Sequence, residues 1–372
     1  MPACLLKRLL TLLVFPTIVA AGAEVGEFSI PPVTPLTPPQ LACLRELTRT
    51  DSSAARLARQ VRDQAVPLLG IEPTPLEVIH YEGLVNTDPR RIATVEKLRQ
   101  MGDVARLMRL WQVSGDVRAR ETLCDLAVGW AAVYRPTGND VNENKFYPLL
   151  VAYLAFRDSM PDSARQVVDS WIGAMAPLHA RAVETSTHFT NRYSKHVRLL
   201  SIFGLIMGRD EWVAASREAI KRFVTQSLRA DGTSFDLEHR DALSYHKSAL
   251  VPMVELARLA GDKGPGLYTW TSPDGGSIEK SVDYLVPYAL GEKVHEEWVN
   301  SRVGLDKRRA EAGLEHYRPG KLFDPKSALD LMSAASYFDK DLLKVVRHLT
   351  ADSTGRFPTW AVLVNEAARC DR

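Results

Sequence analysis

Helical periodicity is the feature that most restricts what this chain can fold into. From Leu41 onward, apolar residues recur at intervals of three and four, whereas alternating β-branched runs are scarce. Such spacing is typical of amphipathic α-helices. The clearest segments are QLACLRELTR, ATVEKLRQMGDVARLMRLWQVSG, RARETLCDLAVGWAAVYR and EWVAASREAIKRFVTQSL. We therefore predict an all-α chain made of helices of roughly 10 to 20 residues.

The glycines and loops between these helices indicate how the helices are arranged. Gly102, Gly115 and Gly138 are expected helix stops or turns, and GPGLYTWTSPDGGS (264–277) is the clearest long loop. Antiparallel helix pairs with short connections form bundles, solenoids or closed toroids. The sequence has no fixed repeat period, which disfavours regular solenoids. A curved or closed α/α array leaves a groove where loops and helix ends converge, and ligands bind in such grooves.

The N-terminus has the pattern of an export signal. Lys7 and Arg8 precede the short apolar run LLTLLVFPTIVAA, and the small residues AGA follow it. We predict a signal peptide over residues 1–23, with an uncleaved anchor as the alternative. A proline-rich, extended lead-in is expected over 24–40 and one helical domain over 41–372. No later segment approaches transmembrane length, so we expect a periplasmic or secreted protein without a membrane partner.

Charge and cysteine content exclude several functional classes. The 372 residues include 47 Lys and Arg and 45 Asp and Glu, a net charge of +2, so no nucleic-acid partner is expected. Cys43, Cys124 and Cys370 remain after signal cleavage, and their spacing is not that of a metal site. One disulfide is possible, and Cys43–Cys370 would join the two ends of the mature chain. No phosphate-binding loop, HExxH or paired CxxC is present, and we expect neither metal nor cofactor.

The first candidate site lies in LEHRDALSYHKSALVPMVELA, where polar residues precede an apolar helix. Asp241 is the expected N-cap of a helix running from Ala242 to Leu259. Arg240 then precedes the helix and Tyr245 lies in its first turn. A helix N-terminus adds positive potential, so this position suits an anion. Arg240 would neutralise a substrate carboxylate while Tyr245 handles a proton, although a surface arginine and a packed tyrosine remain the simpler alternative.

A second polar helix start occurs in STHFTNRYSKHVRLLSIFGLIMG, with a helix expected from about Ser194. A capped, solvated helix end is the alternative for this segment. Two such helix starts in one chain nevertheless favour a polyanionic ligand, because cations and imidazoles would converge. The candidates here are Asn191, Arg192, Lys195 and His196, with His188 upstream.

Two further segments carry candidate sugar-binding groups. The amide-rich loop TGNDVNENKFYPLL could hydrogen-bond sugar hydroxyls, and GEKVHEEWVNSRVGLDKRRAEAG offers a tryptophan that could stack on a sugar ring. Turn formation and an exposed charged helix, DKRRAEAG, are the corresponding alternatives. The candidate binding residues, with one histidine from the first site, are Asn139, Asn142, Glu143, Lys145, His246, His295, Trp298 and Arg302.

Several of these segments together resemble one known family. NRYSKH, PTGNDVNENKFYPLL, HRDALSYHKSALVPMVELA, YEGLVNTDP and KVHEEWVNSRVGLDKRRAEAG are similar to the α/α-toroid alginate lyases and related polysaccharide lyases. The similarity covers roughly residues 75–345. It implies an α/α toroid that cleaves an anionic, uronate-containing polysaccharide by β-elimination.

The resemblance also implies roles for individual residues. Asn191 and Arg240 would neutralise the uronate carboxylate, and Tyr245 would protonate the leaving oxygen or also act as the base. The alginate-specific pattern has a histidine directly after the asparagine, whereas this chain has Arg192. We therefore expect His196 to be the catalytic histidine, with His188 as the alternative. This departure makes a glucuronate-containing exopolysaccharide a possible substrate beside alginate.

Two other classes of function fit a chain of this kind. An inverting glycoside hydrolase could use two carboxylates such as Asp241 and Glu297. A non-catalytic polysaccharide-binding protein would bind the polymer and never shorten it.

Overall fold

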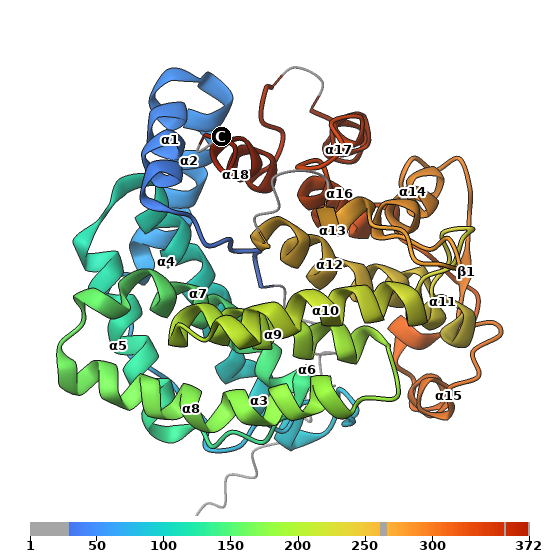
Figure 1. The fold of residues 1–372 in the computed structure, drawn as a ribbon, viewed down its shortest axis with the longest axis horizontal. Helices are drawn as coiled ribbons and strands as arrows, with labels where there is room; N and C mark the ends of the chain where they lie inside the picture. The colour runs from blue at the N-terminus through green and yellow to red at the C-terminus, as the bar shows by residue number, and fades with distance from the viewer. Residues whose placement is uncertain (1–29, 261–265, 353–354, 371–372) are drawn as a thin grey trace, which may run out of the picture.

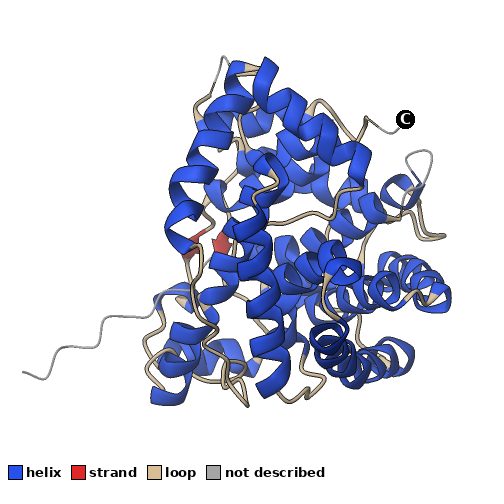
Figure 2. Ribbon diagram, turned by 90° about the vertical axis from the view of Figure 1, so that its left-hand side faces the viewer, coloured by secondary structure: helices blue, strands red, loops and turns tan. Residues whose placement is uncertain are grey.

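The chain folds into an α/α toroid, as predicted. The computed structural model describes residues 30–260, 266–352 and 355–370. Within these ranges helices dominate, and they follow a curved course from α1 round to α18 (Figure 1). Among the residues that the structure describes, strand structure is confined to two short segments, which lie beside the helices in Figure 2. None of the helices in the described ranges combines the length and the apolar character needed to cross a membrane.

Short connections link most of the helices along the chain. The first half of the described chain contains α1 (Pro38–Thr50), α2 (Ser52–Ala65), η1 (Val66–Leu68), α3 (Pro89–Leu98), α4 (Gln100–Ser114), α5 (Val117–Val133), α6 (Asp140–Glu143), η2 (Asn144–Phe146), α7 (Tyr147–Phe156), η3 (Arg157–Ser159) and α8 (Asp162–Thr185). The second half contains α9 (Asn191–Met207), α10 (Asp210–Ser227), α11 (Phe235–Arg240), α12 (Leu243–Leu259), α13 (Gly266–Thr269), α14 (Ile278–Ala289), β1 (Glu296–Glu297), α15 (Gly304–Glu311), η4 (Glu315–Tyr317), β2 (Lys321–Leu322), η5 (Pro325–Ala328), α16 (Leu329–Ala335), α17 (Leu342–Thr350) and α18 (Trp360–Ala367).

Local sequence signals set where several helices begin and end. Thr37 and Gln40 form a reciprocal capping box at the start of α1, and Asp51 caps α2 through the backbone N–H groups of Ser53 and Ala54. Gly115 ends α4 in the left-handed conformation, with a φ of 67°, which glycine adopts without steric cost. These caps satisfy backbone groups that a helix end otherwise leaves without partners.

Several expected helix boundaries differ from the structure. The segment predicted as one helical run over 93–115 forms two helices. The helical structure is interrupted at Arg99, between α3 and α4. Gly102 lies buried inside α4 and does not end a helix. The long loop expected over 264–277 contains the short helix α13, and its first two residues lie outside the described ranges.

The core is centred on helices that are buried on several sides. Nearly every residue of α7 is buried, and this helix contacts α4, α5 and α9. An apolar helix without a polar face is stable in water only when other helices surround it. The apolar run YPLLVAYLAF therefore fixes α7 as an inner helix, and the helices around it carry the polar groups.

The described part of the proline-rich lead-in, from Ile30 to Thr37, has no helix or strand, and α1 starts at Pro38, inside the predicted range of 24–40. Its backbone is held by side chains of α4. Arg109 Nη2 donates to the carbonyl of Pro32 at 2.7 Å, and Gln112 Nε2 donates to the carbonyl of Thr34 at 2.8 Å. The predicted signal peptide lies outside the described residues, and the division into 1–23, 24–40 and 41–372 stays a prediction.

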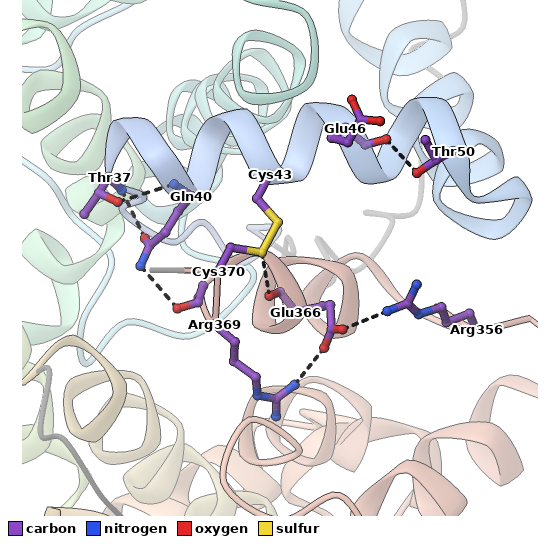
Figure 3. The surroundings of a disulfide bond; sticks show 10 residues. Thr37, Gln40, Cys43, Glu46, Thr50, Arg356, Glu366, Arg369 and Cys370 are labelled. Atoms are coloured by element: carbon purple, nitrogen blue, oxygen red, sulfur yellow. Dashed lines mark hydrogen bonds and ion pairs between the residues drawn. A yellow bond between two sulfur atoms is a disulfide. The ribbon is translucent and has the colours of Figure 1, made fainter. Parts of the chain in front are cut away.

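The two ends of the described chain meet. Helix α1 packs against α18, and a disulfide joins Cys43 to Cys370, as Figure 3 shows. Beside it, Gln40 Nε2 donates a hydrogen bond to the carbonyl of Ala368 at 3.2 Å. The structure thus contains the cysteine pairing that the sequence suggested, and Cys124 is a free thiol.

Candidate active site

A cleft of about 550 Å³ brings the two polar helix starts together. Helix α9 contributes one face to it, whose members recur at helical intervals: Asn191, Arg192, Lys195 and Arg198. Helix α12 contributes Ser244, Tyr245, Lys247, Ser248, Val251 and Pro252. The remaining lining comes from Ile30, from α3 and the segment before it, from α6 and η2, from the end of α11, and from α15 through η4.

The cleft is strongly cationic. Eight Lys and Arg side chains line it: Arg91, Lys145, Arg192, Lys195, Arg198, Arg240, Lys247 and Arg309. Among the described residues, Glu82 is the single carboxylate in the lining. Converging cations in one concave site create a local positive field that the net charge of the chain does not reveal.

Buried carboxylates behind the lining hold several of these arginines in place. Arg192 pairs with Asp140 at 2.7 Å, and Arg240 pairs with Asp306 at 2.6 Å. Arg198 contacts Glu255 at 2.7 Å. Because these acids are buried, the arginines are fixed in orientation while their cleft-facing surfaces stay available to a ligand.

Asn191 is the first residue of α9, and the hydroxyl of Thr190 caps the helix through the backbone N–H of Arg192. The helix therefore starts three residues earlier than the expected Ser194. The backbone N–H of Asn191 donates to Oδ2 of Asp236 at 2.5 Å, and Asn191 lines the cleft. Its position at a helix N-terminus suits an amide that receives an anionic group.

Asp236 is a buried carboxylate that contacts both Asn191 and Arg240. Burial raises its pKa to about 6, although the hydrogen bond from Asn191 and the charge of Arg240 both act to lower it. The Nε atom of Arg240 lies 4.0 Å from Oδ1 of Asp236. Asp236 is thus positioned to hold Asn191 and Arg240 in a fixed relation.

The chain turns sharply between Arg240 and Tyr245. Asp241 is not the N-cap of the following helix. It ends α11 in the left-handed conformation, with a φ of 52°, and α12 starts at Leu243. Aspartate tolerates this conformation better than most residues. The turn places the guanidinium carbon of Arg240 4.0 Å from the ring centroid of Tyr245.

Glu297 takes over the capping of α12. Its Oε1 accepts a hydrogen bond from the backbone N–H of Ser244 at 2.7 Å, and the β1–β2 pairing fixes its position. The carboxylate of Asp241 accepts from the backbone N–H and the side-chain amide of Asn300. Neither carboxylate lines the cleft, so the pair expected for a hydrolase is occupied in structural contacts.

The hydroxyl of Tyr245 lies in a second group of polar atoms. It is 3.4 Å from the hydroxyl of Tyr317 and 3.5 Å from Nη1 of Arg309, which donates to Tyr317 at 2.8 Å. Trp298 is buried behind these rings and meets the ring of Tyr245 edge-on at 5.5 Å. Trp298 therefore supports Tyr245 and does not offer its face to the cleft.

His196 points away from the cleft. Its Nδ1 is 2.8 Å from Nδ1 of His179, and its Nε2 is 3.8 Å from Asp140. His179 in turn contacts Glu143 at 2.6 Å. Burial, reinforced by His179, lowers the pKa of His196 to about 4. Neither His196 nor the exposed His188 is among the residues that line the cleft.

The asparagine-rich loop divides between the cleft and the interior. Lys145 lines the cleft, whereas Glu143 is fully buried and accepts hydrogen bonds from Tyr134 and the 137–138 backbone. Asn142 accepts from the backbone N–H of Glu82 at 3.2 Å and so anchors one wall of the cleft. Asn139 caps α6.

The remaining candidates lie away from the cleft lining. His246 is fully buried, and its two ring nitrogens contact Ser234 Oγ at 2.8 Å and the carbonyl of Ser281 at 2.9 Å. His295 contacts Asp241, and the side chain of Arg302 is exposed. Within the described ranges, no three His, Cys, Asp or Glu side chains are grouped to hold a metal ion.

The sequence patterns did not reveal Arg309 and Tyr317. Both come from the segment DKRRAEAG and the residues after it, which the sequence assigned to an exposed charged helix. Lys307 and Arg308 are indeed exposed, whereas Arg309 turns toward the cleft. The spacing of Asp306 and Arg309 puts both on one helix face, and this was the available signal. No local pattern marked Tyr317.

The comparisons with known proteins concern the family and the fold. The family described as alginate lyase matches residues 50–295, more than half of the chain. No curated protein matches the chain. Among solved structures, an alginate lyase from Bacteroides ovatus is similar at 15% identity with a TM-score of 0.58, over 87% of this chain and 97% of that one.

Two structures of alginate lyase A1-III are also similar in fold. A histidine-to-alanine variant in its apo form has 14% identity and a TM-score of 0.54, over 80% of this chain and 86% of that one. A tyrosine-to-phenylalanine variant complexed with tetrasaccharide has 16% identity and a TM-score of 0.50, over 69% and 81%. At these identities the likeness concerns the fold.

Proposed function

This chain belongs to the alginate lyase family and is a polysaccharide lyase, and from this premise we propose that it cleaves a uronate-containing polysaccharide by β-elimination. Each cut would leave an unsaturated uronate at the new non-reducing end. The substrate class is alginate, including polymannuronate, or a glucuronate-containing exopolysaccharide. The reaction needs no cofactor in this scheme.

The observation that carries the proposal is the charge of the cleft. Eight Lys and Arg side chains and one carboxylate line it, on a chain whose net charge is only +2. Alginate presents one carboxylate per sugar, and a glucuronate-containing polymer presents one per uronate, so several carboxylates can meet fixed cations at once. A neutral polysaccharide carries no carboxylates and would gain nothing from this positive field.

The chemistry of elimination assigns roles to the residues at the centre of the cleft. The proton at C5 lies α to the carboxylate and becomes acidic only when the carboxylate charge is neutralised. Asn191 and Arg240 are the proposed neutralising groups, because both line the cleft and Asp236 fixes them together. Preorganised donors of this kind stabilise the developing enolate-like charge.

Tyr245 is the proposed proton donor to the glycosidic oxygen at C4. It lines the cleft, its hydroxyl lies beside Tyr317 and Arg309, and Arg240 packs on its ring. A neutral phenol can give its proton to an oxygen that leaves with negative charge. The nearby cations would then stabilise the phenolate until solvent restores the proton.

Arg192 is the reason for proposing substrates other than alginate. It directly follows Asn191, where the alginate-specific pattern has a histidine, and it pairs with Asp140 and Glu82. A guanidinium cannot serve as a base at neutral pH, so the reaction must obtain its base elsewhere. This difference is the reason for keeping glucuronate-containing polymers beside alginate.

A panel of uronate polymers tests the proposal. Polymannuronate, polyguluronate, glucuronan and bacterial exopolysaccharides are incubated with the protein, and ultraviolet absorbance reports unsaturated ends. We expect at least one polymer to give absorbance with wild type. Tyr245→Phe retains the ring and should lose about a hundredfold or more in rate while still binding polymer. If every polymer in the panel stays without ultraviolet-absorbing product, the proposed function is rejected.

We also propose export of the mature protein, on the strength of the N-terminal sequence pattern. Mass spectrometry of the protein purified from the periplasm or medium should give an N-terminus close to Glu24. A product that retains residues 1–23 would contradict cleavage.

A further inference from the structure

Lys195 differs from every other cation of the cleft. Arg91, Arg192, Arg198, Arg240, Lys247 and Arg309 each have a hydrogen-bond or ion-pair partner, and Lys145 lies 4.7 Å from the ring centroid of Tyr81. Within the described part of the chain, the Nζ atom of Lys195 makes no hydrogen bond or ion pair. An ammonium group without a partner is costly in a partly enclosed site.

The position of Lys195 follows from the geometry of α9. It lies one turn after Asn191, and residues four apart share a helix face. Both side chains line the cleft. Lys195 is therefore on the same face of α9 as the amide that is proposed to hold the carboxylate. His196 is rotated by about 100° from this face and contacts His179 instead.

The charged groups around Lys195 do not complete an ion pair. They are Asp140 from α6, Lys145 from η2, Asp236 from α11 and Arg192 from α9. Asp140 is engaged by Arg192, and Asp236 accepts from the backbone N–H of Asn191. Burial and the two neighbouring cations lower the pKa of Lys195, so the neutral amine is favoured relative to an exposed lysine.

We propose that the ε-amine of Lys195 is the base that removes the C5 proton of the uronate. This inference rests on the proposed lyase function and supplies its missing group. The amine lone pair takes the C5 proton, and the C5–H electrons form the C4=C5 double bond. The C4–O bond breaks, and Tyr245 gives its proton to the leaving oxygen. Lys195 then carries one extra proton and Tyr245 lacks one, and exchange with solvent restores both.

A charge-only role for Lys195 makes a different prediction, and two variants separate the roles. Lys195→Arg retains a cation but cannot act as a base at neutral pH, because arginine stays protonated. Lys195→Ala removes both the charge and the base. If Lys195 is the base, both variants should lose about a hundredfold or more in kcat. If it only binds the carboxylate, Lys195→Arg should retain most of the activity.

The experiment uses the full-length mature protein and a polymer that wild type cleaves. Initial rates of ultraviolet-absorbing product give kcat and KM for wild type, both variants and the exposed Lys344→Ala on α17. Circular dichroism and polymer binding confirm folding. Added methylamine or ethylamine should raise the rate of Lys195→Ala in proportion to free amine, and should not raise that of wild type. Lys344→Ala should match wild type.

A Lys195→Arg variant within fivefold of wild-type kcat would overturn the inference, and so would a Lys195→Ala variant that no primary amine reactivates. Either result leaves the lyase function standing, because wild type still forms the unsaturated product. Failure of wild type on every polymer rejects the proposed function itself, so the two failures are distinguishable.

Discussion

Two faces of helix α9 differ sharply in chemistry. Lys195 and His196 are adjacent in sequence. The lysine lines the cleft without a partner among the described residues, and the histidine is held at 2.8 Å from His179. Burial lowers the pKa of both side chains. Of the two side chains, the lysine is therefore the one whose nitrogen a substrate in the cleft can meet.

The face of α9 that carries His196, here called the rear face, contacts a buried hydrogen-bond network, here called the rear network. The rear network consists of His179, Glu143 and the groups that donate to Glu143. Glu143 accepts from Tyr134 at 2.9 Å, from the backbone N–H of Thr137 at 2.6 Å and from Gly138 at 3.1 Å, and it contacts His179. A buried carboxylate with this many donors is stabilised in its charged form. A satisfied network of this kind serves stability, whereas groups left without partners in a cleft are available for chemistry.

The largest expected effect concerns the rear network. Glu143→Ala removes a fully buried carboxylate that accepts from two backbone N–H groups and from Tyr134, and that contacts the buried His179. Removing one partner of a buried pair costs about 3–5 kcal/mol. Urea unfolding should show this loss, and the exposed Glu121→Ala on α5 should stay within about 0.5 kcal/mol of wild type. An unchanged unfolding midpoint in Glu143→Ala would show that the network is not structural.

The next effect concerns the cleft face. Asn191→Ala and Arg240→Ala should each lower turnover by about a hundred- to a thousandfold, because each removes a preorganised partner of the carboxylate. Asn191→Ala is the cleaner variant, since Arg240→Ala also leaves Asp306 without its 2.6 Å partner. The exposed Arg308→Ala on α15 serves as the control. Wild-type turnover in folded Asn191→Ala would remove that residue from the mechanism.

The smallest expected effect is a pH dependence of stability from His196. Its folded pKa of about 4 lies below the ordinary value of 6.5, so the unfolded chain binds more protons between these values. The contribution of His196 to the free energy of unfolding should therefore be largest above pH 6.5. It should fall as the pH drops toward 4, by at most about 3 kcal/mol. Asp236, with its pKa raised to about 6, opposes this change in the same window.

His196→Asn isolates that contribution, because asparagine does not titrate. The difference in unfolding free energy between wild type and His196→Asn should change with pH from 6.5 to 4, and turnover of the folded variant should stay within a few-fold. A hundredfold loss of turnover with intact folding would return His196 to the catalytic role that the sequence suggested, and would break the contrast between the two faces of α9.

Much of the fold could be predicted because helix formation depends on near neighbours. The periodicity of EWVAASREAIKRFVTQSL predicted α10 within a residue at each end. The local sequence pattern gave a wrong prediction where a backbone turn depends on groups that are distant in sequence. Asp241 has the composition of an N-cap, but Trp298 and Asn300 engage its carbonyl and carboxylate from a segment more than fifty residues later. Those contacts favour the left-handed turn and give the capping role to Glu297.

The sequence by itself determined the helical class, the two polar helix starts and the presence of Asn191, Arg240 and Tyr245 at them. Only the tertiary structure decided which side of each helix faces the cleft. A helix turns by about 100° per residue, so Lys195 and His196 would exchange cleft and interior if α9 rotated by about one residue. That rotation is set by packing of α8, α10 and α12 against α9, which the residues around Asn191 do not encode by themselves. The same long-range packing brings Arg309 and Tyr317 to Tyr245 and buries Trp298 behind it.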